Sequence, residues 1–322
     1  MRDNELSQAR GRASNASHSQ AEPGNESGKR APRRTLPRCT DRLSLGGQGL
    51  SVSPICLGMV RSPDAVSAAF DAGVNFFFLS ADMHWPLYEP LRQGLKDLLR
   101  RGRGIREKIV IGAACYPAQP DFCRYPFQEV LDAVPEFKRL DVLIAGGAYS
   151  RDFPERLPVY EQHRRTNFAG ARAIGTSFHD RPTALAAINE RLVDIAFIRY
   201  NPGHPGARHD LFPHIVSVPR PLVFNFKSTL GYVPPDLQAE LGLPGDEYWQ
   251  PTITDYYRFA LTRPELDGLL VAPATPVELA GLVAALELGP LDDEEEQFLL
   301  NLALVARGGA RVVPERLVKH AP

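Results

Sequence analysis

Polar side chains that could move protons or hold a ligand follow several apolar segments of the chain. Asp82 and His84 follow one such segment, and Ser177 and His179 follow another. An imidazole titrates near neutral pH, so His84 is the first candidate for a proton donor and His179 the second. Lys227 follows a third segment, where an ammonium group could contact a phosphate. The sequence thus offers the side chains of an enzyme site.

A second group of candidates could bind a metal ion. His204, His209, Asp210 and His214 lie within eleven residues. Zinc and iron accept histidine and carboxylate ligands. The spacing matches no compact motif such as His-Glu-x-x-His. We therefore assign no metal ligand and keep metal-dependent chemistry as an alternative.

These candidates depend on the strands that precede them. After residue 40, short apolar runs alternate with helical stretches, which is typical of βαβ units and a parallel sheet. A small β-hairpin over residues 42–52 comes first, and no Gly-x-Gly-x-x-Gly follows the first strand, which disfavours an open doubly wound sheet. The sequence predicts an α/β fold, a (β/α)8 TIM barrel, with strands near 55–57, 74–79, 109–111, 142–144, 173–175, 195–200, 222–226 and 269–271.

In such a barrel, functional residues lie at the C-terminal ends of the strands. We therefore expect Trp85 and His204 in a substrate pocket, together with Trp249 from the long loop at 230–253. A loop of that length could cover the pocket as a lid.

Composition limits the partners and the compartment. The net charge is −1, which gives no electrostatic basis for nucleic-acid or membrane binding, so we expect a small-molecule substrate. Four widely spaced cysteines favour reduced thiols and a cytoplasmic location. Residues 1–38 carry eight basic and four acidic side chains and few large apolar ones, which predicts a disordered basic tail before a barrel domain at 39–322.

Seven segments, in order, resemble the aldo-keto reductase superfamily, and the resemblance covers most of residues 42–305. They include Leu57-Gly58-Met59, Ala72-Gly73-Val74-Asn75-Phe76-Phe77, Ile174-Gly175-Thr176-Ser177 and Ala272-Pro273-Ala274-Thr275-Pro276. The resemblance implies a (β/α)8 barrel that reduces carbonyl groups with NADPH.

The family's catalytic residues are replaced in this chain. The family uses Asp, Tyr, Lys and His, with the tyrosine as general acid. The matching positions here hold Phe78, Met83, Ala114 and Gly146. The alanine and the glycine predict a hollowed site. A different proton donor is then needed, and a shift of one residue would bring Asp82 or His84 to the site.

The resemblance also implies a cofactor site. Tyr200 would pack on the nicotinamide and Ser177 would hold its carboxamide. The pyrophosphate and the adenosine phosphate would be held by Lys227, Ser228, Ala274, Thr275 and Glu278, the last three at a helix start. The family's usual asparagine after Ser177 is Phe178, and the usual arginine near Thr275 is missing, so the choice between NADP and NAD stays open.

The sequence therefore predicts a divergent oxidoreductase that uses NADP or NAD on a small carbonyl-type substrate, with a non-standard proton donor. Two alternatives from other classes stay open. One is a non-catalytic barrel that acts as a binding subunit. The other is an enzyme that depends on a metal ion or on histidine acid–base chemistry.

Overall fold

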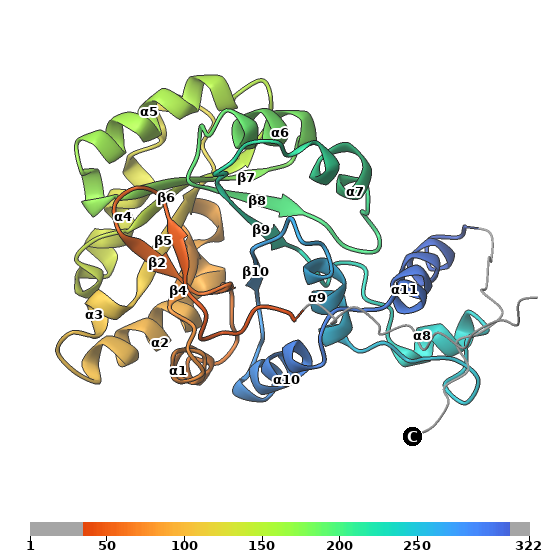
Figure 1. The fold of residues 1–322 in the computed structure, drawn as a ribbon. Coiled ribbons are helices and arrows are strands. Elements are labelled where there is room, and N and C mark those ends of the chain that lie inside the picture. Colours follow the sequence, from red (N-terminus) through yellow and green to blue (C-terminus); the bar gives the residue numbers. More distant parts are fainter. Residues whose placement is uncertain (1–34, 310–322) are drawn as a thin grey trace, which may run out of the picture. The chain divides into compact units, whose positions relative to one another are not determined.

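The computed structural model describes residues 35–309, and its centre is a closed barrel of parallel strands (Figure 1). Around the barrel the strands run in the order β10-β3-β4-β5-β6-β7-β8-β9. They are β3 (Ile55–Leu57), β4 (Phe76–Ser80), β5 (Val110–Cys115), β6 (Val142–Ala148), β7 (Ala173–Phe178), β8 (Ile195–Arg199), β9 (Leu222–Phe226) and β10 (Gly268–Val271). The predicted fold class is confirmed. Residues 1–34, which hold most of the predicted tail, lie outside the described residues.

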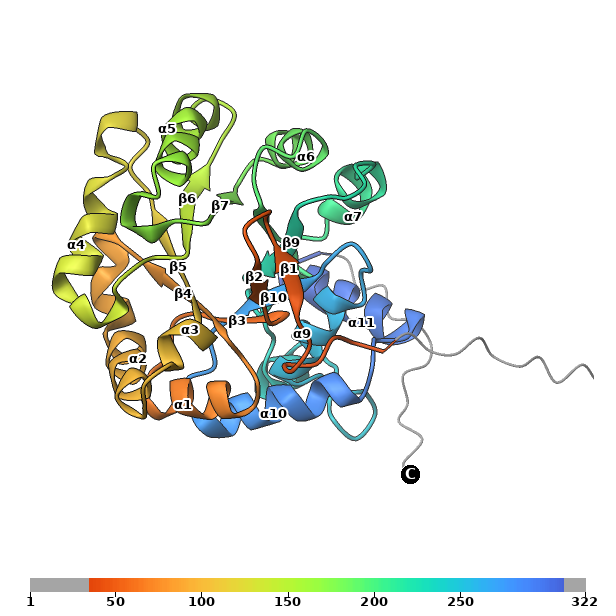
Figure 2. The ribbon, with the colours of Figure 1, turned by 60° about the vertical axis from the view of Figure 1, so that its left-hand side comes forward.

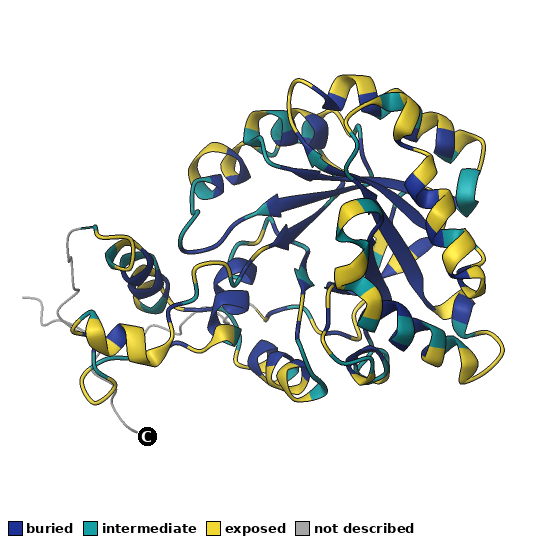
Figure 3. Ribbon diagram, turned by 180° about the vertical axis from the view of Figure 1, so that it is seen from behind, coloured by how far each residue is buried: buried dark blue, intermediate teal, exposed yellow. Residues whose placement is uncertain are grey.

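Helices surround the strands, with buried faces toward the barrel and exposed faces outward (Figure 3). The described helices are α1 (Asp64–Asp71), α2 (Glu89–Arg100), α3 (Ile105–Lys108), α4 (Tyr125–Ala133), α5 (Phe153–Arg165), α6 (Arg181–Asn189), α7 (Ala207–Asp210), α8 (Pro235–Glu240), α9 (Ile253–Leu261), α10 (Pro276–Glu287) and α11 (Asp293–Val305). Between residues 35 and 309, no helix is long and apolar enough to cross a membrane.

The predicted hairpin covers the N-terminal end of the barrel (Figure 2). It consists of β1 (Leu43–Leu45) and β2 (Leu50–Val52), paired antiparallel. Leu45 and Leu50 are buried in the same apolar cluster as Phe76, which points into the barrel from β4. The side-chain amide of Asn75 donates to the carbonyl oxygen of Ser51 at 2.8 Å. The hairpin thus closes this end, and ligands must enter from the C-terminal end of the strands.

Four Asp or Asn side chains tie neighbouring strands together at the N-terminal edge. One of them lies directly before each of β4, β6, β8 and β10, which are alternate strands of the barrel. In each case the carboxylate or amide oxygen accepts a backbone N–H from the start of the preceding strand, at 2.6–2.9 Å. In the three aspartates, the backbone N–H also donates to the carbonyl oxygen of that same partner. The four pairs are Asn75 with Ser53, Asp141 with Ile111, Asp194 with Ile174, and Asp267 with Val223.

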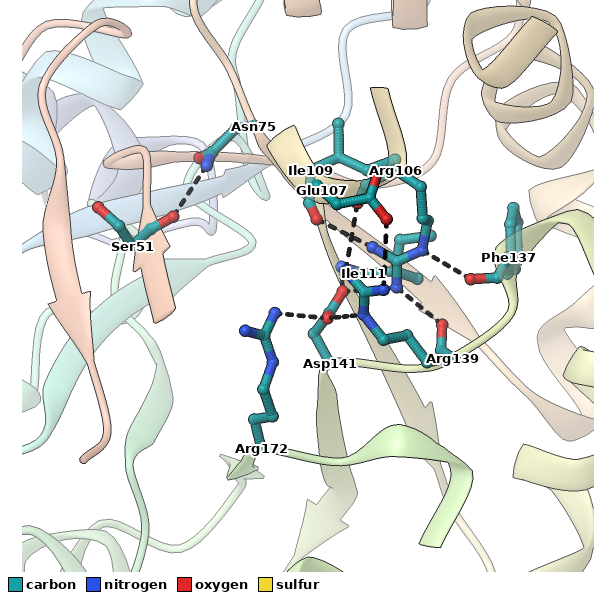
Figure 4. A network of polar contacts seen from close by, with 10 residues as sticks. All are labelled: Ser51, Asn75, Arg106, Glu107, Ile109, Ile111, Phe137, Arg139, Asp141 and Arg172. Atoms are coloured by element: carbon teal, nitrogen blue, oxygen red, sulfur yellow. Dashed lines mark hydrogen bonds and ion pairs between the residues drawn. The ribbon is translucent and has the colours of Figure 1, made fainter. Parts of the chain in front are cut away.

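Asp141 carries the most heavily charged of these contacts (Figure 4). It is fully buried, and its oxygens accept from Arg106 at 2.8 Å, Arg139 at 2.9 Å and Arg172 at 2.8 Å. Burial alone would raise the pKa of Asp141, but Arg106, the Ile111 N–H and Arg172 together hold it below its usual value. The carboxylate therefore stays ionised and compensates the surrounding guanidinium groups.

Replacing Asp141 should strongly destabilise the barrel. Asp141→Ala leaves buried guanidinium charge uncompensated, so we expect the free energy of unfolding in urea at pH 7 to fall by about 3–5 kcal/mol. The pKa of Asp141 is lower in the folded state, so its contribution is present at neutral pH and is lost as the pH falls below about 4. The matched control is Asp97→Ala, because Asp97 is 48% exposed and pairs with Arg100 on the surface of α2. That variant should lose less than about 1 kcal/mol. Equal losses in the two variants would contradict this role for Asp141.

Candidate functional site

A cavity of about 770 Å³ opens at the C-terminal end of the barrel. Phe78 of β4 and Phe197 of β8 line it, and their rings meet edge to face at 5.6 Å. Alternate residues of a strand face the barrel interior, so the cavity walls come from inward positions such as Ser177, Phe226 and Leu270. The aromatic ring of Phe78 thus stands where the family resemblance places a carboxylate.

Two of the three predicted acid–base residues line this cavity, and the third lies beside one of them. His84 and His179 are lining residues. Asp82 and His84 belong to a 3-10 helix, η1 (Asp82–Tyr88), that follows β4. The Asp82 Oδ1 lies 3.7 Å from the His84 Nδ1, and neither atom has a hydrogen-bond partner among the described residues. The two atoms are therefore available to each other.

The backbone of Asp82 is held in an unusual conformation. Its φ is +74°, in the left-handed region that a residue with a side chain rarely adopts. The other carboxylate oxygen of Asp82 accepts the backbone N–H of Tyr116 at 2.7 Å. Such strained positions are often found at functional sites. This contact holds one oxygen of the Asp82 carboxylate at the Tyr116 backbone, while the other oxygen faces His84.

Tyr116 is a cavity residue to which the sequence analysis gave no role. Its ring lies 4.7 Å from the ring of His84. A Cβ added at Gly146 would lie only 2.8 Å from the Tyr116 ring. Burial raises the pKa of Tyr116, and Asp82 raises it further, so its hydroxyl stays protonated. The expectation of a hollow at Gly146 is wrong, because Tyr116 fills that space.

A buried arginine supports the strand ends beneath Tyr116. Arg156 of α5 donates to the carbonyl oxygens of Cys115 at 2.8 Å and Gly146 at 3.0 Å. It also pairs with Asp152 at 3.0 Å. Arg156 therefore holds the ends of β5 and β6 together at the point where Tyr116 leaves the barrel.

Three of the predicted cofactor residues, Ser177, Lys227 and Ser228, line the cavity. The Ser177 hydroxyl accepts the backbone N–H of Gly147 at 2.8 Å, which leaves its proton free to donate. The Ser228 hydroxyl is buried and donates to Asn225. Lys227 is exposed at the rim, with a φ of +58° and its Nζ 5.8 Å from the ring centroid of Phe226.

Tyr200 does not reach the cavity, contrary to the prediction. It is fully buried outside the barrel, where its ring stacks on Phe259 of α9 at 5.1 Å. Phe197 of β8 faces inward, so Tyr200, three residues later, lies on the outer side. The aromatic ring on this side of the cavity is Phe226 of β9. Its inward position could have been found by counting alternate residues along the strand.

The three predicted substrate-pocket residues are also outside the cavity lining. Trp85 lies under the guanidinium of Arg92 at 3.6 Å and faces α4. Trp249 packs on Phe298 of α11 at 5.6 Å, so its part of the 230–253 loop is docked on α11 and does not cover the cavity. His204 contacts Asn201 at 3.2 Å. The N-terminal end of that loop does line the cavity, through Leu230, Gly231 and Tyr232.

The residues predicted to hold the adenosine phosphate form hydrogen bonds with one another. The Thr275 hydroxyl accepts the backbone N–H of Glu278, and the Glu278 carboxylate accepts that of Ala274. They form the cap of α10, and the cavity lining extends only to Ala272.

The histidine group is not a metal centre in the described part of the chain. No group of three or more His, Cys, Asp or Glu side chains between residues 35 and 309 is placed to hold a metal ion. Asp210 instead pairs with Arg181 at 2.6 Å.

Comparison with known proteins supports the fold. No protein-family model and no curated protein matches the sequence. Among solved structures, AKR11C1 of Bacillus halodurans in its holo form is 15% identical with a TM-score of 0.61, and covers 86% of this chain and 99% of its own. PA4992, a putative aldo-keto reductase of Pseudomonas aeruginosa, is 20% identical with a TM-score of 0.57, over 78% and 97% of the two chains.

A third structure, the Bombyx mori aldo-keto reductase AKR2E4 in complex with NADP, is 16% identical with a TM-score of 0.58, over 82% and 92% of the two chains. At these identities the likeness concerns the fold. The chain therefore has the barrel architecture found in aldo-keto reductases, as its sequence segments predict.

The contact between Gly146 and Tyr116 can be tested by a double-mutant cycle. Gly146→Ala forces the Tyr116 ring to move, and such overpacking should lower the free energy of unfolding by about 1–3 kcal/mol. In a Tyr116→Ala background the three atoms closest to the added methyl group are removed, so its cost should largely disappear. Urea unfolding of the four proteins gives the coupling energy. Additive effects would mean that Tyr116 does not fill the space over Gly146.

Proposed function

We propose that this chain is a nicotinamide-dependent oxidoreductase that acts on a small carbonyl-type substrate, with His84 as its proton donor. The observation that carries the proposal is the His84–Asp82 pair beside the cavity, at the barrel end where enzymes of this fold act. Supporting it, the chain shares its fold with aldo-keto reductases, one of which is in complex with NADP.

The cavity offers groups that suit the nicotinamide end of the cofactor. Phe226 offers a flat ring and Ser177 a hydroxyl proton for an amide oxygen. Lys227 offers a phosphate an ammonium group that has no hydrogen-bond or ion-pair partner among residues 35–309. The side at Thr275 offers less, because its polar atoms are used in the cap of α10. These groups do not distinguish NADP from NAD.

The proposed chemistry divides between the cofactor and the chain. When bound, a reduced nicotinamide supplies a hydride. As the proton donor, His84 acts in its imidazolium form and releases the proton of Nε2, because its Nδ1–H faces the Asp82 carboxylate. The Asp82 carboxylate stabilises the imidazolium and fixes the ring, and Tyr116 excludes water from one face of that ring. A positioned acid of this kind contributes about 10²–10⁴-fold to a rate.

The first test is cofactor binding. We expect calorimetric titration of the full chain with NADPH or NADH to give a dissociation constant in the micromolar range. This corresponds to a binding free energy on the order of −8 kcal/mol. A lack of binding at millimolar cofactor would overturn the oxidoreductase proposal and favour a non-redox barrel that binds another ligand.

The second test addresses His84. With a carbonyl substrate found by screening, His84→Ala should lower kcat by about 10²–10⁴-fold and leave cofactor affinity nearly unchanged. His209→Ala is the matched control, because His209 is an exposed histidine away from the cavity lining. Unchanged kcat in His84→Ala would remove His84 from the mechanism.

A further inference from the structure

Cationic and imidazole side chains meet at the mouth of the barrel on three neighbouring strands. Arg199 is the last residue of β8 and lies opposite Phe226, a cavity residue of β9. On the other side, Phe178 of β7 lies opposite Ile198, so His179 and Arg199 come next on their two strands. Phe197 lines the cavity two residues before Arg199. Arg199 therefore faces inward, just above the lining of the cavity.

Two cations in this region have no hydrogen-bond or ion-pair partner in the described part of the chain. Neither the guanidinium of Arg199 nor the ammonium group of Lys227 makes a hydrogen bond or ion pair with another residue between 35 and 309. Arg199 is also partly buried. By contrast, the nearby Arg181 is compensated by Asp210, and Arg307 donates to the carbonyl oxygen of Gly203.

His179 reports the local charge. Its ring stacks on Tyr149 at 5.5 Å and meets Phe226 edge to face at 6.1 Å. Burial lowers the pKa of His179, and Lys227 and Arg199 lower it further. The same two cations also lower the pKa of His204, after burial and together with Arg307 and Arg181. Positive charge thus dominates this side of the mouth, where low-dielectric walls strengthen its field.

We propose that Arg199, with His179 beside it, binds an anionic group of the substrate, either a carboxylate or a phosphate. The planar guanidinium presents paired N–H donors that match both groups. Lys227 is then left for the cofactor phosphate. The assignment of this anion to the substrate rests on the proposed function, whereas the anion site itself does not.

The experiment uses inorganic phosphate as the probe and calorimetry on the full chain. Phosphate should bind to the wild type. Arg199→Gln should weaken phosphate binding by about tenfold or more, because hydrogen bonds to charged groups contribute more free energy than those between neutral groups. Arg199→Lys keeps the charge and should retain part of the affinity. Arg101→Gln is the control, because Arg101 is an exposed arginine of the surface that pairs with Asp71. Absence of phosphate binding, or equal binding to wild type and Arg199→Gln, would overturn the proposal.

Two further arms test whether the bound anion belongs to the substrate or to the cofactor. Phosphate should still bind with NADPH at saturation, and Lys227→Gln should weaken NADPH more than Arg199→Gln does. Displacement of phosphate by NADPH would overturn the assignment to the substrate. If no cofactor binds, the proposed function fails, while the phosphate titration still tests the anion site.

The NMR titration of the His179 ring checks the geometry without any ligand. Removing a nearby cation should raise the pKa of His179 in Arg199→Gln, whereas Arg101→Gln should leave it unchanged. An unaltered His179 pKa in folded Arg199→Gln would show that Arg199 does not face this ring, and would overturn the proposal.

Discussion

The barrel depends on the hydrogen bonds that close its N-terminal edge. The first residues of each strand in a parallel sheet present backbone groups that must be paired when they are buried. Asp141, Asp194 and Asp267 meet this need twice, through the backbone N–H and through the carboxylate, and each also pairs with arginine. The hairpin then covers this end. Contacts within the chain thus fix the N-terminal end of the barrel, and the cavity lies at the other end.

The replacements at the C-terminal end are coupled rather than independent. Gly146 is required by the position of the Tyr116 ring, and that ring in turn contacts His84. The Tyr116 backbone N–H holds Asp82, whose second oxygen faces the same histidine. These contacts link Asp82, His84, Tyr116 and Gly146 into one arrangement beside the cavity, and the aromatic ring of Phe78 stands where the sequence resemblance places a carboxylate.

The sequence was sufficient for the barrel and for part of the site. Buried parallel strands form continuous apolar runs, so all eight could be placed. Residues at or soon after the C-terminal end of a strand, such as Ser177, His179 and His84, then line the mouth of the barrel. Whether a residue faces the barrel interior depends on the alternation along its strand, and this alternation places Tyr200 on the outer side. The positions of Trp85 and Trp249 depend on contacts with α4 and α11 that no local pattern encodes. The aspartates before β6, β8 and β10 do have a local signal, an acidic residue directly before an apolar run, that could have been used.

The two ends of the barrel also differ in how charge is compensated. At the N-terminal edge, ion pairs with arginines of the chain neutralise the carboxylates of Asp141, Asp194 and Asp267. At the open end, Arg199 and Lys227 have no acidic partner among residues 35–309, although both lie close to histidines whose pKa values they lower. Partly buried charge, such as that of Arg199, is costly unless an opposite charge compensates it. The same physical requirement, that partly buried charge be matched, is therefore met by the chain at one end and is left for a bound anion at the other.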